Sequence, residues 1–64
     1  MENSVYIFFD DNKNSLKILS FLKKKLQLTS LKKASLLIVV GGDGFMLKTL
    51  KKHHILGKPF YGIN

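Results

Sequence analysis

The feature that most constrains the fold is the segment SLLIVV at residues 35–40, an uninterrupted apolar run from Leu36 onward, which passes directly into the glycine-rich turn GGDG at residues 41–44. A strand with one face in water alternates apolar and polar residues, whereas a continuous apolar run is typical of a strand covered on both faces. Such strands lie in the middle of parallel sheets. The run therefore predicts a central parallel strand with the glycine turn at its carboxyl end.

Two further apolar runs, VYIFF at residues 5–9 and FYGI at residues 60–63, predict two more strands. Helical periodicity fills both intervals between the three strands. Strand, helix, strand, turn, helix, strand is the βαβαβ pattern, which builds parallel sheets through right-handed crossovers. The predicted fold class is α/β, one βαβαβ half of an open parallel sheet.

The first helix is expected to begin at a cap, Asn14 or Ser15, and to run to about Leu26. Residues 27–34 are polar and have no clear period, so they predict a loop with room for one very short strand. The second helix is expected over residues 45–54. Its apolar side would consist of Met46, Leu47 and Leu50.

Length and composition exclude several classes of protein. A chain of 64 residues holds one domain at most, and 45% hydrophobic residues is too apolar for a disordered tail. Without Cys there is no disulfide scaffold and no Cys-based zinc site. No apolar run approaches the roughly 20 residues that span a bilayer, and no secretory leader begins the sequence. We therefore expect a cytoplasmic protein without a membrane partner.

The net charge of +7 comes from eleven Lys residues against four acidic ones. A basic chain invites a nucleic-acid role, but there is no Arg for bidentate contacts with phosphates or bases. No aromatic residues are spaced among the Lys residues as a stacking platform would require. We therefore expect the Lys side chains on solvated surfaces. A small basic module that binds nucleic acid or an acidic partner remains the alternative from another functional class.

The glycine turn is the one stretch that indicates chemistry. Ligands of open α/β sheets bind outside the carboxyl ends of strands, and glycines permit positive φ and a close approach to a ligand. The helix that follows begins with unpaired N–H groups that suit a phosphate. A carboxylate would repel a phosphate, so Asp43 suggests a proton acceptor for a hydroxyl or a partner for a phosphate-bound metal. The structural alternative is that Asp43 helps to cap the helix and the glycines permit the bend.

The same turn, followed by a helix and by PFYGIN at residues 59–64, resembles the N-terminal part of the NAD kinases. The resemblance implies phosphorylation of the adenosine ribose 2′-hydroxyl of NAD, with ATP or polyphosphate as donor, a divalent metal such as Mg²⁺, and a homo-oligomeric enzyme. Diacylglycerol-type lipid kinases share the GGDG motif, so a lipid-kinase fragment is the alternative among enzymes. The strand that ends in Gly62, Ile63 and Asn64 favours the NAD kinases.

By this resemblance Asp43 is the catalytic proton acceptor, and the nucleotide is bound by Gly42, Asp43, Gly44, Lys48 and Asn64. Lys48 stands where the family often has Arg or His, and Phe45 stands where a small polar residue is usual. The family's later Asn-Asp/Glu motif and its C-terminal all-β domain do not occur in these 64 residues. We therefore expect residues 1–64 to be a partial N-terminal α/β nucleotide-binding domain that is inactive on its own.

Other polar residues have plainer interpretations. Asp10 and Asp11 follow the first predicted strand and would reach the same sheet edge as Asp43, most simply as a polar turn. His53 and His54 are adjacent, so on a helix they point about 100° apart and do not share a metal ion. No residue of this chain is predicted to be a metal ligand.

Overall fold

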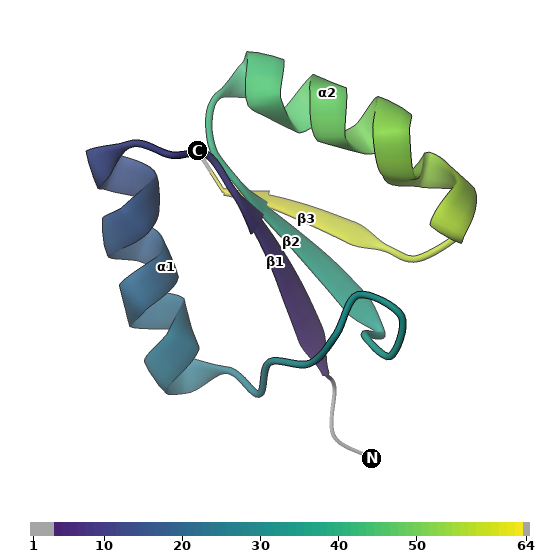
Figure 1. The fold of residues 1–64 in the computed structure, drawn as a ribbon, viewed down its shortest axis with the longest axis horizontal. Coiled ribbons are helices and arrows are strands. Elements are labelled where there is room, and N and C mark those ends of the chain that lie inside the picture. The colour runs from purple at the N-terminus through teal and green to yellow at the C-terminus, as the bar shows by residue number, and fades with distance from the viewer. Residues whose placement is uncertain (1–3, 64) are drawn as a thin grey trace.

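An open sheet of three parallel strands, β1 (Val5–Phe9), β2 (Leu36–Val40) and β3 (Phe60–Ile63), lies between two helices (Figure 1). The helix α1 (Lys13–Lys25) follows β1, and α2 (Asp43–His53) follows β2 and continues into the short 3-10 helix η1 (His54–Leu56). The structure is a computed structural model that describes residues 4–63. The predicted α/β class and βαβαβ order are confirmed.

The strand β2 is central, as the apolar run predicts. It pairs with β1 from Leu36 opposite Val5 to Val40 opposite Phe9, and with β3 on its other edge. Both faces are covered by helices, and Leu37, Val39 and Val40 are fully buried. The strand begins at Leu36 rather than at Ser35, whose side chain is exposed.

The helix α1 covers one face of the sheet. Its apolar side chains pack on a buried cluster that β1 and β2 contribute jointly, Val5, Ile7, Ile38 and Val40. The predicted cap, Asn14 or Ser15, is wrong, because the N-cap is Asn12. Asn12 has an extended backbone, with φ −141° and ψ 166°, and its Oδ1 accepts a hydrogen bond from the Ser15 N–H at 2.8 Å.

The helix α2 covers the opposite face, where Met46 and Leu50 lie over Val39, Phe60 and Gly62. Helix and strand approach closely here, because a Cβ added to Gly62 would lie 2.9 Å from the Met46 sulfur. The prediction that Leu47 belongs to the apolar side is wrong, because its side chain is 58% exposed. A position next to Met46 is rotated by about 100° on a helix, which turns Leu47 toward solvent.

Residues 27–29 add a short parallel pairing on the outer edge of β1. The Val5 N–H donates to the Gln27 carbonyl at 3.0 Å, and the Thr29 N–H donates to the Val5 carbonyl at 2.9 Å. This pairing is an isolated bridge outside the three strands, and it lies in the segment where the predicted loop left room for a very short strand.

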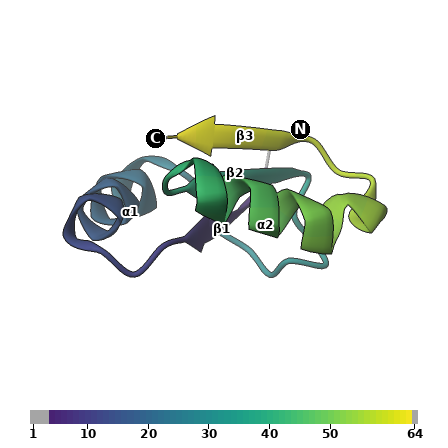
Figure 2. The same cartoon turned by 90° about the horizontal axis from the view of Figure 1, so that it is seen from above.

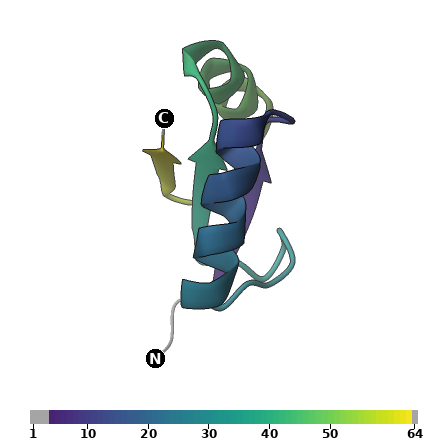
Figure 3. The ribbon, with the colours of Figure 1, turned by 90° about the vertical axis from the view of Figure 1, so that its left-hand side faces the viewer.

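The outer pairing explains why the helices lie on opposite faces, as Figures 2 and 3 show. From β1 the chain crosses through α1 to the outer edge at Leu28, and then returns to pair β2 with the inner edge of β1. From β2 it moves on through α2 to β3. Right-handed crossovers that move across a sheet in opposite directions place their helices on opposite faces. The direction of winding therefore reverses between β1 and β2.

Candidate functional site

The carboxyl ends of β1 and β2 meet where the winding reverses, which in open α/β sheets is the place where ligands bind. The Asp10 N–H, just past β1, donates to the Val40 carbonyl at 2.9 Å. The Gly41 N–H, just past β2, donates to the Ile63 carbonyl at 3.0 Å. As expected for parallel strands, Asp10 and Asp43 follow neighbouring strands at one edge of the sheet.

Gly41 is required by packing rather than by an unusual backbone. A Cβ added there would lie 2.7 Å from Cδ2 of Phe45 and 3.1 Å from Cβ of Asp10. The turn does not use the freedom of glycine to adopt positive φ, because within residues 4–63 only Gly57, after η1, has a positive φ. The chain passes into α2 with an ordinary extended residue, Gly42, at φ −77° and ψ 178°.

Gly42 and Gly44 differ from Gly41 in having open space beside them. A Cβ added to either glycine would meet no atom within 4 Å, and both residues are exposed. No contact among the described residues explains why positions 42 and 44 are glycines. The two glycines leave the backbone at the start of α2 accessible from outside.

Asp43 is the first residue of α2 and its side chain is exposed. The cap position before it, Gly42, makes no side-chain hydrogen bond. Within residues 4–63 the Asp43 carboxylate makes neither a hydrogen bond nor an ion pair, so it does not cap α2 through a hydrogen bond. A negative charge is favoured at this end of a helix. Asp43 is therefore an unengaged acceptor at the carboxyl edge of the sheet.

The structure does not bring Lys48 to the same place. Lys48 is exposed on α2, five residues beyond Asp43, which corresponds to about 140° of rotation around a helix. The ammonium group is thus carried on another side of α2 than the carboxylate. Asn64, the remaining predicted nucleotide-binding residue, lies outside the described residues.

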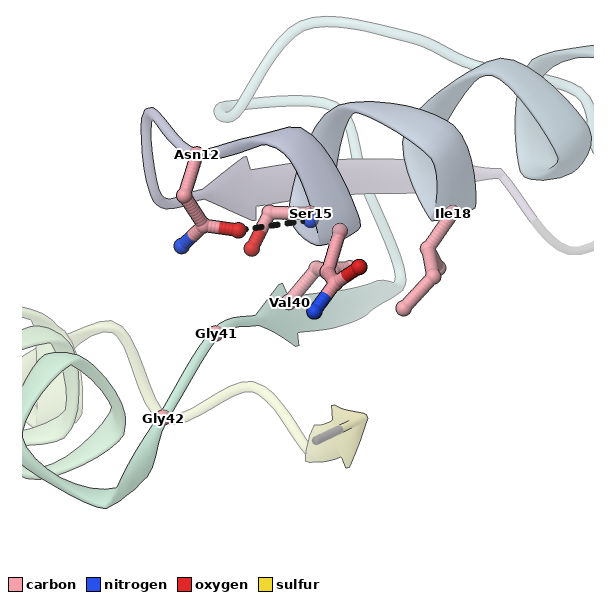
Figure 4. A pocket seen from close by; sticks show the side chains of 7 residues that line it. Asn12, Ser15, Ile18, Val40, Gly41 and Gly42 are labelled. Atoms are coloured by element: carbon pink, nitrogen blue, oxygen red, sulfur yellow. Dashed lines mark hydrogen bonds between the residues drawn. The ribbon is translucent and has the colours of Figure 1, made fainter.

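A polar hollow of about 210 Å³ lies beside the glycine turn, between the start of α1 and the end of β2 (Figure 4). Its lining residues are Asn12, Asn14, Ser15, Ile18, Val40, Gly41 and Gly42. The sequence pattern indicates Asn14 and Ser15 only as helix caps and does not indicate that they line a site. The available signal was that they follow β1, whose carboxyl end meets that of β2 in a parallel sheet.

Metal-ligating side chains do not gather in the part of the chain that the structure describes. No group of three His, Cys, Asp or Glu residues there is close enough to hold an ion. His53 stacks on the Phe8 ring with centroids 4.6 Å apart, and His54 Nδ1 lies 3.0 Å from the Lys51 carbonyl oxygen. The divalent metal that the resemblance implies stays a prediction.

The Lys residues lie mainly on the surface, as expected. Ten of the eleven are exposed, and Lys58 is half-buried. Lys58 Nζ donates to the carbonyl oxygens of Leu31 and Lys32 at 2.6 and 2.8 Å, so it ties the start of β3 to the loop before β2. Neither helix in residues 4–63 is long and apolar enough to cross a membrane.

Comparisons with known proteins agree with the resemblance seen in the motifs. The chain is 32% identical over 62 residues to the NAD kinases of Rickettsia akari and Rickettsia rickettsii, and 31% identical to that of Rickettsia prowazekii. The match covers 97% of this chain and 24% of each relative, so the chain spans about a quarter of their length. No protein-family model matches the chain. No solved structure matches it either.

Proposed function

We propose that this chain supplies part of the nucleotide site of an NAD-kinase-like phosphotransferase, with Asp43 as the proton acceptor. The observation that carries the proposal is the free, exposed carboxylate of Asp43 at the carboxyl edge of a parallel sheet. The similarity to NAD kinases over 62 residues supports NAD and ATP as the substrate pair.

The proposed step is a phosphoryl transfer between two nucleotides. The ribose 2′-oxygen of NAD attacks the terminal phosphorus of ATP, the bond from that phosphorus to the bridging oxygen breaks, and ADP leaves. Asp43 takes the proton that the hydroxyl loses, as a general base does when it lies within hydrogen-bond reach. A carboxylate with no protein partner is free for this contact, whereas one held by a cap hydrogen bond would first have to release it.

The open backbone beside Asp43 supports the same proposal. Gly42 and Gly44 flank the carboxylate, and a side chain at either position would extend into space that the described residues leave empty. A ligand bound to Asp43 approaches the start of α2 without displacing a side chain. The N–H groups at that helix start suit the phosphates of a nucleotide.

We further propose that residues 1–64 form part of a nucleotide-binding α/β domain and do not turn over NAD by themselves. Phosphoryl transfer depends on holding two substrates in line, and positioning supplies much of the rate. Asp43 and Lys48 are both exposed, and their positions lie about 140° apart around α2. The groups that position the second substrate would have to lie outside these residues.

A chimera tests the proposal. The matching segment of the Rickettsia akari NAD kinase is replaced by residues of this chain, and NADP formation from NAD and ATP is measured. We expect the chimera to form NADP and Asp43→Asn to lower kcat about 10²- to 10⁴-fold, the usual contribution of a positioned general base. Asp11→Asn is the matched control, because Asp11 is exposed just beyond the neighbouring strand β1, and it should leave kcat within about twofold.

Two results would contradict the proposal. One is a folded chimera, verified by circular dichroism, in which Asp43→Asn keeps the full rate. The other is NADP production above background by the isolated 64-residue chain, which would overturn its proposed inactivity.

A further inference from the structure

The hollow between α1 and β2 contains a hydroxyl group without a protein partner. Ser15 is only 3% exposed, yet within residues 4–63 its Oγ makes no hydrogen bond. Every fully enclosed side-chain nitrogen or oxygen in this part of the chain has a partner. The Ser15 Oγ is therefore not sealed in the core; it opens into the hollow that Ser15 lines (Figure 4).

Backbone donors lie in the same first turn of α1 as this hydroxyl. The first N–H groups of a helix have no partner within the helix. In α1 the Ser15 N–H is taken by the Asn12 side chain at 2.8 Å, which leaves the N–H groups of Lys13 and Asn14 free. These donors lie at the positive end of a 13-residue helix. The exposed Asn14 side chain adds a neutral amide to the lining.

The opposite wall is backbone from the glycine turn. Gly41 is buried against Phe45, and Gly42 leaves open space where a side chain would stand. The start of α2 follows directly, so two helix N-termini from neighbouring strands border one hollow. Two carboxylates lie just before α1 in the chain, those of Asp10 and Asp11, and neither residue is among the lining residues. The Asp10 carboxylate already accepts the Asp11 N–H at 2.9 Å.

We propose that this hollow binds a phosphate group, held by the Ser15 hydroxyl and the N–H groups at the start of α1. Hydroxyl and N–H donors at a helix N-terminus recognise phosphate oxygens. The volume of about 210 Å³ is several times the roughly 30 Å³ that one water molecule occupies in the liquid. The hollow therefore has room for a phosphate or diphosphate. The assignment of this phosphate to a nucleotide substrate rests on the proposed function, whereas phosphate binding itself does not.

The test is an amide chemical-shift titration of the isotope-labelled 64-residue chain with inorganic pyrophosphate and, separately, with ADP. We expect the largest shifts at Lys13, Asn14, Ser15, Gly41 and Gly42. Equal or tighter binding of ADP with the same shifts identifies a nucleotide as the source of the phosphate. Binding of pyrophosphate alone identifies free inorganic phosphate, and supports the site while separating it from the proposed kinase function.

Two pairs of variants separate this site from the surface lysines. Asn14→Asp places a carboxylate at the mouth of the hollow and should weaken pyrophosphate binding about tenfold or more. Its control, Gln27→Glu, makes the same amide-to-carboxylate change beyond the other end of α1 and should change binding less than about twofold. Ser15→Ala should weaken binding several-fold, whereas Ser20→Ala, at an exposed position of the same helix, should not.

Asp43→Asn should leave pyrophosphate binding intact or tighten it, because it removes a negative charge near the hollow. The kinase proposal can therefore fail in the chimera while phosphate binding persists, and the reverse can also occur. The inference is overturned by shifts spread evenly over the lysine-bearing surfaces, by equal weakening in Asn14→Asp and Gln27→Glu, or by unchanged binding in Ser15→Ala.

Discussion

The two helix starts at the carboxyl edge of the sheet occupy equivalent places in the fold and present different chemistry. The start of α1 has a side-chain cap, Asn12, and the largely buried Ser15 lines the hollow. The start of α2 has Gly42 at the cap position, without a side-chain hydrogen bond, and exposes the Asp43 carboxylate. Both starts offer N–H donors, and the start of α2 adds an acceptor, the Asp43 carboxylate.

In both proposals the fold determines where a ligand binds, and the residues around each cap determine which group of the ligand is bound. Both helices direct unpaired N–H groups toward the edge where β1 and β2 end. At α1 the cap residue engages one of these groups and holds the first turn in place. At α2 a glycine cap leaves all of them open beside a carboxylate, an arrangement suited to a hydroxyl that must lose its proton.

Gly41, which lies between the two helix starts, should give the largest effect on stability. In Gly41→Ala the new Cβ meets the Phe45 ring at 2.7 Å and Asp10 Cβ at 3.1 Å. We expect the free energy of unfolding to fall by about 1–3 kcal/mol, as for other overpacked buried positions. Urea unfolding of the 64-residue chain measures the change. Gly44→Ala, where a Cβ meets nothing within 4 Å, is the control, and equal losses in both variants would contradict the packing role of Gly41.

Removal of the cap of α1 should have an intermediate effect. In Asn12→Ala the Ser15 N–H loses its side-chain acceptor at 2.8 Å. We expect a loss of about 1 kcal/mol, which lowers Tm by about 4–8 °C in a domain of this size. Asn14→Ala is the matched control, because Asn14 is exposed in the same turn and makes no cap hydrogen bond. If Asn14→Ala lowers Tm as much as Asn12→Ala does, the cap hydrogen bond is not the cause of the lower stability.

Addition of a cap to α2 should have the smallest effect. Gly42→Ser supplies a hydroxyl at an extended position, φ −77° and ψ 178°, from which it can accept an N–H of the first turn. The gain over glycine should be a few tenths of a kcal/mol, or a rise in Tm of about 2 °C. Gly42→Ala has no acceptor and should show no rise. A lower Tm in Gly42→Ser would mean that the start of α2 does not tolerate a side-chain cap.

The strands were predictable because their apolar runs are local. Residues 5–9 and 60–63 form the strands that their composition predicts, and 35–40 differs from β2 by one residue. The glycine turn at the end of β2 was predictable for the same reason. Asp43 could be selected as a candidate site residue because a bend between a strand and a helix does not need a carboxylate among three glycines.

The helix starts and faces were less predictable, because they depend on contacts with the rest of the fold. Several Asn and Ser residues follow β1, and only the path of the chain past the sheet decides that Asn12 has the extended backbone of a cap. The second helix starts at Asp43, two residues before the expected Phe45. Its rotation is set by Phe45 against Gly41 and Met46 against Gly62, which turns Leu47 into solvent.

The sequence by itself determined three parallel strands, two helices and a carboxylate-bearing glycine turn after the central strand, since each follows from local composition and periodicity. The tertiary structure alone decided that Asn14 and Ser15 lie across a hollow from Gly41 and Gly42. The physical reason is strand order. Residues 27–29 pair with one edge of β1 and β2 pairs with the other edge, and this arrangement reverses the winding. Residues that pair at such a distance in the sequence leave no local signal.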